Sequence, residues 1–126
     1  METKANIQNL IVDGKIYVPL DSVLQKAEQL DGMDYVIVRT YSAGVHAGYL
    51  KSYLSGTKEV KLCSARRIWK WYGAATLSEL ATFGTNKPSD CKFGCPVGIT
   101  LTEAIEIIVC TEQSRQSIQG VPQWKI

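Results

Sequence analysis

Apolar and polar residues alternate over several short stretches of the chain, with the spacing of two that is typical of β-strands with one buried face. Valine, isoleucine and aromatic residues fill these stretches, and turns containing glycine and serine separate them. Gly48 lies inside one stretch, where we expect a close backbone approach or a sharp bend. The expected strands cover residues 35–40, 45–53, 59–63 and 65–72. Short antiparallel strands of this kind predict a small barrel of the SH3 or Sm-like type.

Helical signals follow the predicted strands. Thr76 and Glu79 have the spacing of a capping box, which predicts a short helix beginning there. Thr111 can cap a last helix that ends at Gly120, just before Pro122. The expected fold class is therefore mainly β with short helices, an α+β arrangement. Between the two helices we expect a loop over residues 84–98 and a closing strand over residues 99–109, unless residues 101–104 form a helical turn.

The first 33 residues have a pattern of their own. Apolar runs on either side of Asp13-Gly14 predict a β-hairpin over residues 7–18. Asp21 can cap a helix whose apolar residues recur at helical spacing as far as Leu30. We therefore divide the chain into an N-terminal appendage of hairpin plus helix, residues 1–33, and a small barrel-like domain, residues 34–126.

The composition is that of an ordinary globular protein. The chain has 126 residues, of which 45% are apolar and 21% charged, and this suits a compact domain with a real core. No apolar run reaches the length of a transmembrane helix, and the N-terminus lacks the basic start and apolar stretch of a signal peptide. We expect a cytoplasmic protein that does not associate with membranes.

The four cysteines, Cys63, Cys91, Cys95 and Cys110, are expected to be free thiols. Three residues separate Cys91 from Cys95, a spacing that zinc sites use, but no second paired motif accompanies them. Cys63 and Cys110 suit the core as small hydrophobic residues. We therefore predict neither a bound metal nor a cofactor.

Recognisable catalytic motifs are absent from the sequence. His46 is the one histidine, and no neighbouring motif marks it as part of a catalytic triad. Walker A, dinucleotide-binding and HExxH motifs are missing as well. The sequence therefore favours a binding protein over an enzyme.

Positive charge is concentrated in one third of the chain. Residues 34–72 carry seven basic and two acidic side chains, a net charge of +5, whereas residues 1–33 carry −2 and residues 73–126 carry −1. Such a concentration favours an anionic partner. On charge alone, a basic region is more often a solvent-exposed face than a binding site. The types of residue in the region must therefore distinguish the two interpretations.

The segment from Ala65 to Gly73 adds tryptophans and arginines to this basic region. Aromatic rings stack on nucleobases, cationic side chains contact phosphates, and the N-terminus of the following helix offers unpaired N–H groups. We therefore predict a pocket for a phosphate-bearing, nucleotide-like small molecule. Its candidate residues are Arg66, Arg67, Trp69, Lys70, Trp71, Tyr72 and Thr76, with Arg39 and His46 as additions from adjacent strands.

Strand alternation divides these candidates between two faces. A buried arginine would need a partner, so we expect the face with two cations to be the exposed one. The two tryptophans then fill the core, and a tyrosine provides the stacking surface. The exposed set is Arg66, Lys70 and Tyr72, and the opposite set is Arg67, Trp69 and Trp71.

Five blocks of the sequence form a further pattern: Tyr35–Leu50, Ala65–Ala81, Cys91–Phe93, Ala104–Ile108 and Cys110–Glu112. In these blocks the chain resembles a family of small tailed-bacteriophage proteins. The resemblance covers roughly residues 34–124 and leaves residues 1–33 outside. That family has no activity from which residue roles can be transferred. The resemblance implies a phage accessory protein that acts in the bacterial cytoplasm during infection.

In that context we expect a non-enzymatic sponge that sequesters a cyclic nucleotide or cyclic ADP-ribose immune signal. A nucleic-acid-binding module that uses the same basic face is one alternative. A protein–protein inhibitor or minor structural phage protein, with the tryptophan-rich strand as core or interface, is another. Ligand length separates the first two, because a polymer gives a steep salt dependence. We also expect a homo-oligomer, because an open small barrel leaves strand edges that must be covered.

Overall fold

The computed structural model describes residues 10–12, 15–17 and 25–126 of the chain. Strands β1 (Leu10–Val12) and β2 (Lys15–Tyr17) pair antiparallel with each other. The hairpin predicted around Asp13-Gly14 is confirmed in these two strands, while its turn lies outside the described residues.

The helix predicted from Asp21 to Leu30 is wrong over residues 25–30, which are described and not helical. In this segment Ala27 N–H donates to the Cys110 carbonyl at 3.0 Å, and Lys26 forms a β-bridge opposite Thr111. Backbone pairing with the main domain therefore outweighs the helical spacing of apolar residues. The start of the predicted helix lies outside the described part of the chain.

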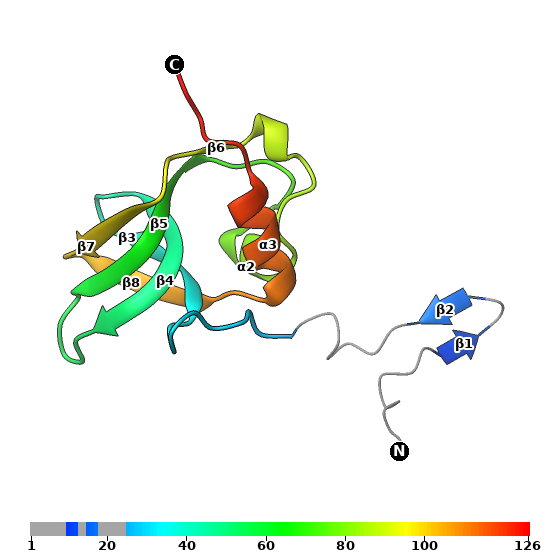
Figure 1. Cartoon of the computed structure of the whole chain (residues 1–126), viewed down its shortest axis with the longest axis horizontal. Coiled ribbons are helices and arrows are strands. Elements are labelled where there is room, and N and C mark those ends of the chain that lie inside the picture. Colours follow the sequence, from blue (N-terminus) through cyan, green and yellow to red (C-terminus); the bar gives the residue numbers. More distant parts are fainter. Residues whose placement is uncertain (1–9, 13–14, 18–24) are drawn as a thin grey trace.

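Six strands form one antiparallel sheet (Figure 1). The longest, β5, pairs with β4 along one side, while β7 pairs with its first half and β6 with its second half on the other side. The main path runs β6-β5-β4-β3-β8, so β8 is an edge strand, and among the described residues β3 is its one strand partner. The strands are β3 (Tyr35–Thr40), β4 (Val45–Tyr53), β5 (Val60–Lys70), β6 (Lys92–Phe93), β7 (Val97–Leu101) and β8 (Ala104–Val109).

Strand boundaries in the second half of the sheet differ from the prediction. The strands expected over 59–63 and 65–72 are one strand, β5, because Ser64 adopts a φ of 51° at an irregularity in its pairing and lets the strand continue. The single strand expected over 99–109 is instead β7, a bend and β8. The predicted loop contains the short 3-10 helix η1 (Pro88–Asp90) and β6.

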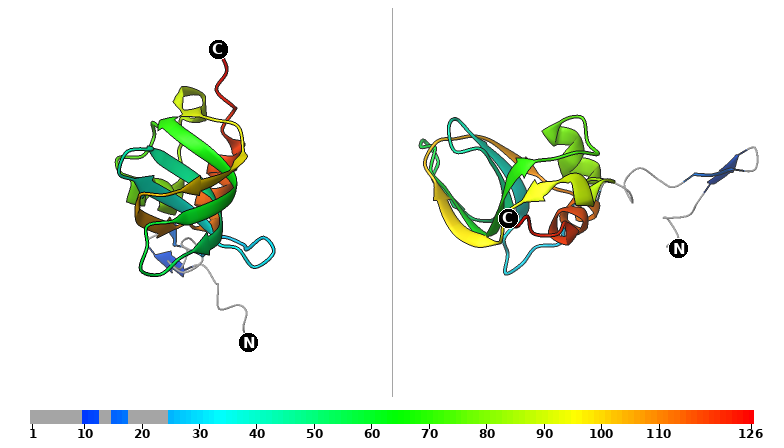
Figure 2. Two further views of the ribbon diagram at one scale, coloured as in Figure 1. Left: turned by 90° about the vertical axis from the view of Figure 1, so that its left-hand side faces the viewer. Right: turned by 90° about the horizontal axis from the view of Figure 1, so that it is seen from above.

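Helices α2 (Leu77–Phe83) and α3 (Glu112–Gly120) begin where their caps were predicted. Thr76 Oγ1 accepts a hydrogen bond from Glu79 N–H at 3.1 Å, and Thr111 Oγ1 accepts one from Ser114 N–H at 3.1 Å. The two helices lie together against one face of the sheet (Figures 1 and 2). None of the helices in the described residues is long and apolar enough to cross a membrane.

The sheet buries a core on each of its faces. Along β3, Tyr35 and Ile37 point into the cluster beneath the helices, whereas Val36 and Val38 point into a second cluster within the curve of the sheet. Figure 2 shows this curvature from the end of the sheet. The strand predicted here is confirmed, and both of its faces are buried, which explains its nearly continuous apolar sequence.

The curved sheet stays open. Within the described residues β7 and β8 follow each other around a bend but do not pair with each other. The predicted α+β class, mainly β with short helices, is confirmed. The close backbone approach predicted at Gly48 is confirmed as well, because a Cβ there would lie 2.8 Å from Ala65 Cα.

Candidate functional site

The structure corrects the sequence prediction at Arg66, which was expected on the surface, and at Trp69, which was expected in the core. Arg66 and Ile68 are 5% and 4% exposed and lie on the helix side of the sheet. Trp69 is 60% exposed on the opposite side, where Arg67 is half-buried. Alternation holds from Arg66 to Trp69, so Arg66 belongs to the core and Trp69 to the surface. The pairing shifts register between Ile68 and Lys70, and beyond this point Lys70 and Tyr72 are exposed and Trp71 packs against the core, as predicted.

Arg66 is buried, and its partners among the described residues are backbone carbonyls and not carboxylates. Its Nε donates to Gly94 O at 2.8 Å, and its Nη1 donates to Ile118 O at 2.9 Å and to Val121 O at 2.7 Å. The guanidinium also lies 5.5 Å from the ring centroid of Phe93, and burial lowers the pKa of Arg66 from its ordinary value. Its donors hold the end of α3 against the sheet and are not free for a ligand.

Two exposed tryptophans meet at this end of the sheet. Trp69 of β5 and Trp124 of the C-terminal segment pack edge to face, with ring centroids 6.2 Å apart and planes at 66°. The Cζ atom of Arg67 lies 5.5 Å from the Trp69 ring centroid, and the Nζ atom of Lys92 lies 5.1 Å from that of Trp124. We call Arg67, Trp69, Lys92 and Trp124 the aromatic face.

Lys70 and Tyr72 lie next to the aromatic face. Lys70 is paired across the sheet with Lys92, and its Nζ atom lies 5.4 Å from the ring centroid of Tyr72. In the described residues, no acidic side chain forms an ion pair with Arg67 or with either lysine. Like charges at opposed positions of two strands repel each other. This part of the surface therefore favours an anion.

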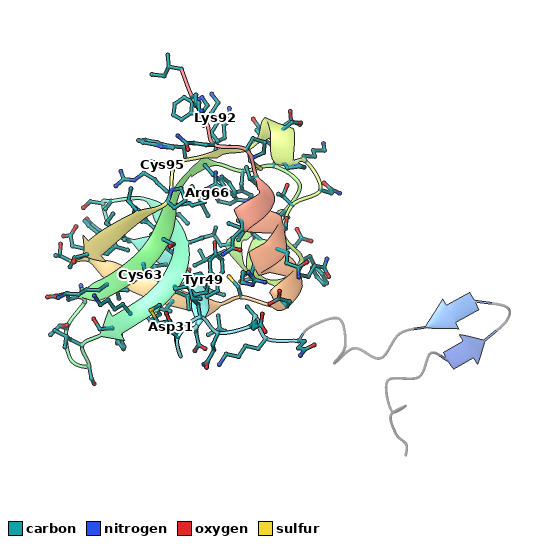
Figure 3. All side chains as sticks on the ribbon, viewed as in Figure 1. Asp31, Tyr49, Cys63, Arg66, Lys92 and Cys95 are labelled. Atoms are coloured by element: carbon teal, nitrogen blue, oxygen red, sulfur yellow. The ribbon has the colours of Figure 1, made fainter. Side chains whose placement is uncertain are left out.

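The C-terminal segment reaches the aromatic face because it runs beside β6. Gln123 bridges Phe93 in parallel, and Trp124 N–H donates to Phe93 O at 2.9 Å. Arg66 contacts the carbonyls of residues on either side of this junction, Gly94 and Val121. Figure 3 shows Arg66 and Lys92 at the same end of the molecule. The buried arginine thus positions the segment that carries the second tryptophan.

Trp71 and Thr76 serve the fold. Trp71 packs against the core beneath the helices, and its Nε1–H donates to Ala74 O at 3.1 Å. Thr76 is the cap of α2, and the carboxylate of Glu79 accepts a hydrogen bond from Ala75 N–H. At this helix start the Thr76 hydroxyl engages Glu79 N–H, and the carboxylate beside it engages Ala75 N–H and opposes the approach of an anion.

Arg39 and His46 are not brought into the aromatic face. Arg39 Nε donates to Glu106 Oε1 at 3.0 Å in an exposed ion pair. His46 is 1% exposed, and its Nε2 donates to Ala43 O at 2.9 Å. Burial lowers the pKa of His46, against the opposing effect of the Ala43 carbonyl, and the charge of Arg67, directly opposite on β5, lowers it further. The imidazole is therefore neutral at neutral pH.

All four cysteines are free thiols. Cys110 is buried, and burial raises the pKa of its thiol to about 12, while Cys63 is half-buried against the core beneath the helices. Among the described residues, no three His, Cys, Asp or Glu side chains are grouped so that they could hold a metal ion.

Three surface hollows lie away from the aromatic face. One of about 340 Å³ lies between Lys51, Lys61 and Gly98. A second of about 300 Å³ lies between Tyr53 and β8. A third of about 320 Å³ lies beside Gln25. None of these three hollows is lined by a residue of the aromatic face.

Sequence reasoning missed Lys92 and Trp124. Lys92 falls in a segment that was predicted as a loop, and Trp124 follows the last helix, where no periodic pattern remains. The available signal was an isolated tryptophan between the polar residues Gln123 and Lys125. A sequence pattern alone cannot show that this tryptophan lies beside Trp69.

The fold and site together define a small α+β domain with a curved antiparallel sheet, two helices on one face and an exposed aromatic and cationic surface. The chain belongs to a family described as a domain of unknown function (DUF6948), whose model matches residues 33–118. The match includes Arg67, Trp69 and Lys92 and ends before Trp124. Comparisons of the chain with curated proteins and with solved structures found no match.

Proposed function

We propose that the protein is a non-enzymatic binder of single-stranded nucleic acid and that the strand docks on the aromatic face. One observation carries the proposal: Trp69 and Trp124 expose adjoining rings, and a cation lies over each. Aromatic rings stack on any base, and neighbouring cations contact the backbone phosphates. The combination suits a ligand in which bases and phosphates alternate.

The angle between the two indoles favours a single strand over a duplex. With planes at 66°, Trp69 and Trp124 cannot both stack on the same flat pair of bases. Two successive nucleotides whose bases are splayed apart can each meet one ring. Base pairing in a duplex prevents such splaying, whereas a single strand allows it at little cost. The opposed lysines, Lys70 and Lys92, then lie where a phosphate between the two bases would relieve their repulsion.

The exposure of the two tryptophans, 60% for Trp69 and 42% for Trp124, favours a polymer over a small molecule. A site for a small ligand buries most of the ligand's surface. Rings as exposed as those of Trp69 and Trp124 give a cyclic nucleotide little enclosure, and the three hollows described above lie elsewhere. Sequestration of a cyclic immune signal, expected from the sequence, is therefore the second ligand class, and the titrations below distinguish it.

The proposal also includes the barrel type of the fold and the biological context of the protein. The curvature of the sheet and the apolar cluster inside it support a barrel of the SH3 or Sm-like kind that is left open beside β8. The resemblance in the sequence blocks supports a phage accessory protein of the bacterial cytoplasm.

Titration of fluorescently labelled single-stranded DNA and RNA of about 16 nucleotides tests the proposal, with duplex DNA of the same length in parallel. We expect Trp69→Ala and Trp124→Ala each to weaken single-strand binding by roughly 5- to 150-fold, because one stacking contact contributes about 1–3 kcal/mol. Phe83→Ala, which removes a half-exposed ring from α2, is the matched control and should leave binding unchanged.

The salt dependence tests the cations separately. Contacts from Arg67, Lys70 and Lys92 to three phosphates predict a slope of about −2 for the logarithm of the association constant against that of salt concentration. Lys92→Ala should reduce that slope by roughly 0.7. Lys61→Ala removes an exposed lysine from the hollow on the other side of the sheet and should not change it.

Cyclic dinucleotides and cyclic ADP-ribose isomers belong in the same titrations. Saturation by one of these molecules, with no gain from a longer strand, would replace the nucleic-acid proposal by sequestration. If neither class binds the wild-type protein, both proposals fail, and the exposed tryptophans are better explained as a contact surface for another protein.

A further inference from the structure

Strand β8 has an unpaired edge that the nucleic-acid proposal does not use. Cys110 N–H donates to Tyr35 O at 3.0 Å, which sets the direction of the backbone groups along the strand. Because these directions alternate, the N–H and C=O groups of Ile107 and Val109 point away from β3. No other strand in the described residues covers that side of β8.

The features that usually protect an edge strand are weak at this edge. Natural edges carry lysine or proline, or a charge that points inward. β8, with the sequence Ala-Ile-Glu-Ile-Ile-Val, has one charged residue, and its carboxylate is already paired with Arg39. Val109 is 49% exposed and Ile105 is 45% exposed. The edge is therefore apolar and nearly neutral in charge, which suits an apolar strand without net charge as its partner.

The same edge is complementary to itself. The pairing of β8 with β3 is regular from Glu106 to Val109 and becomes irregular between Glu106 and Ala104. If two copies of the regular part are placed antiparallel about Ile108, Ile107 of each copy lies opposite Val109 of the other. All outward backbone groups of these two residues are then paired. Arg39 neutralises the charge of Glu106 within each copy, so neither copy brings an uncompensated charge to the contact.

We propose that the protein forms a symmetric dimer in which the β8 strands of two copies pair antiparallel, with Ile108 at the two-fold axis. The dimer joins two sheets into one and covers the edge that the fold leaves open. The partner is a second copy of the same chain, because the apolar pattern and the backbone directions of β8 are both symmetric about Ile108. The proposal does not depend on the ligand of the aromatic face.

Sedimentation of the full chain at micromolar concentration gives the first test. We expect a mass of twice 13.9 kDa. Val109→Lys, which places a charge against an apolar residue of the partner, should weaken the dimer at least tenfold. The matched control is Val97→Lys, because Val97 is a 46% exposed valine on β7, and it should leave the dimer intact. A monomeric wild-type protein, or a dimer that resists Val109→Lys, would overturn the proposal.

Cross-linking tests the register. In a background with Cys63→Ser and Cys95→Ser, oxidation of Ile108→Cys should produce a covalent dimer, because opposed residues at the two-fold axis have the separation of a disulfide. Val109→Cys should cross-link much less, since its partner residue is not a cysteine. Faster cross-linking of Val109→Cys than of Ile108→Cys would overturn the register. Concentration-dependent protection of the Ile107 and Val109 amides from hydrogen exchange provides a readout that needs no substitution.

Discussion

Arg66 and Arg67 are adjacent in the sequence, yet β5 directs them to opposite faces where they serve different purposes. Arg66 is 5% exposed and donates to four backbone carbonyls, those of Phe93, Gly94, Ile118 and Val121. Arg67 lies on the face that carries Trp69 and has no ion-pair partner in the described residues. One arginine therefore belongs to the core, and the other is available to a ligand.

The difference shows that a buried arginine does not need a carboxylate. The last carbonyls of a helix have no partners within the helix, and they form the negative end of its dipole. A guanidinium offers five donors in one plane, so it can satisfy several of these carbonyls at once. The carbonyls that hold Arg66 lie 27 to 55 residues away in the sequence, and a local pattern cannot show that they converge.

Replacing each arginine by glutamine should give the largest contrast. We expect Arg66→Gln to lower the free energy of unfolding by about 3–5 kcal/mol, because buried carbonyls lose their donors. Arg67→Gln should change it by less than about 0.5 kcal/mol, as is usual for surface substitutions. Urea denaturation followed by far-UV circular dichroism measures both. Equal losses for the two variants would contradict the assignment of the faces.

The next residues along β5 extend the contrast to apolar side chains. Ile68 is 4% exposed and Trp69 is 60% exposed. Ile68→Ala should lower the free energy of unfolding by about 2–4 kcal/mol through lost burial and a cavity, whereas Trp69→Ala should lower it by less than about 1 kcal/mol. If the larger residue proved the more costly to remove, Trp69 would have to be part of the core after all.

The glycines of β4 and β7 give a smaller contrast of the same kind. A Cβ at Gly48 would lie 2.8 Å from Ala65 Cα on β5, whereas one at Gly98 would meet nothing within 4 Å. We expect Gly48→Ala to destabilise the fold by about 1–3 kcal/mol through overpacking. Gly98→Ala should leave stability unchanged or raise it slightly, because it restricts the unfolded chain. Thermal unfolding of the two variants under identical conditions makes the comparison.

Local signals in the sequence predicted the elements well and their contacts poorly. The caps at Thr76 and Thr111 depend on residues three positions away, so the helices begin where they were expected. The strands β3 and β4 were also predicted correctly, because valine and isoleucine alternate or run together between clear turns. By contrast, apolar spacing predicted a helix through residues 25–30, where pairing with Cys110 and Thr111 decides the structure.

The candidate site shows the same limit more sharply. The segment from Ala65 to Gly73 was identified correctly as the place where aromatic and basic residues meet. Which of its faces is exposed depends on the end of α3, and the second ring of the aromatic face comes from Trp124, 55 residues after Trp69. Composition therefore predicted the chemistry of the surface, whereas the choice between Arg66 and Arg67 required the structure.

His46, directly opposite Arg67, gives the smallest effect and tests the position of the Arg67 guanidinium through the pH dependence of stability. Because burial holds the pKa of His46 below its ordinary value of 6.5, its imidazole binds a proton more readily in the unfolded chain than in the folded one. Stability is therefore complete above about pH 6.5 and falls as the pH drops below it. His46→Gln should abolish this dependence between about pH 5 and 7, since the chain has one histidine. Arg67→Gln should weaken this pH dependence, because the charge of Arg67 helps to lower the pKa of His46. If the pH dependence of the Arg67→Gln variant were unchanged, the guanidinium would have to lie farther from His46 than the pairing of β4 and β5 indicates.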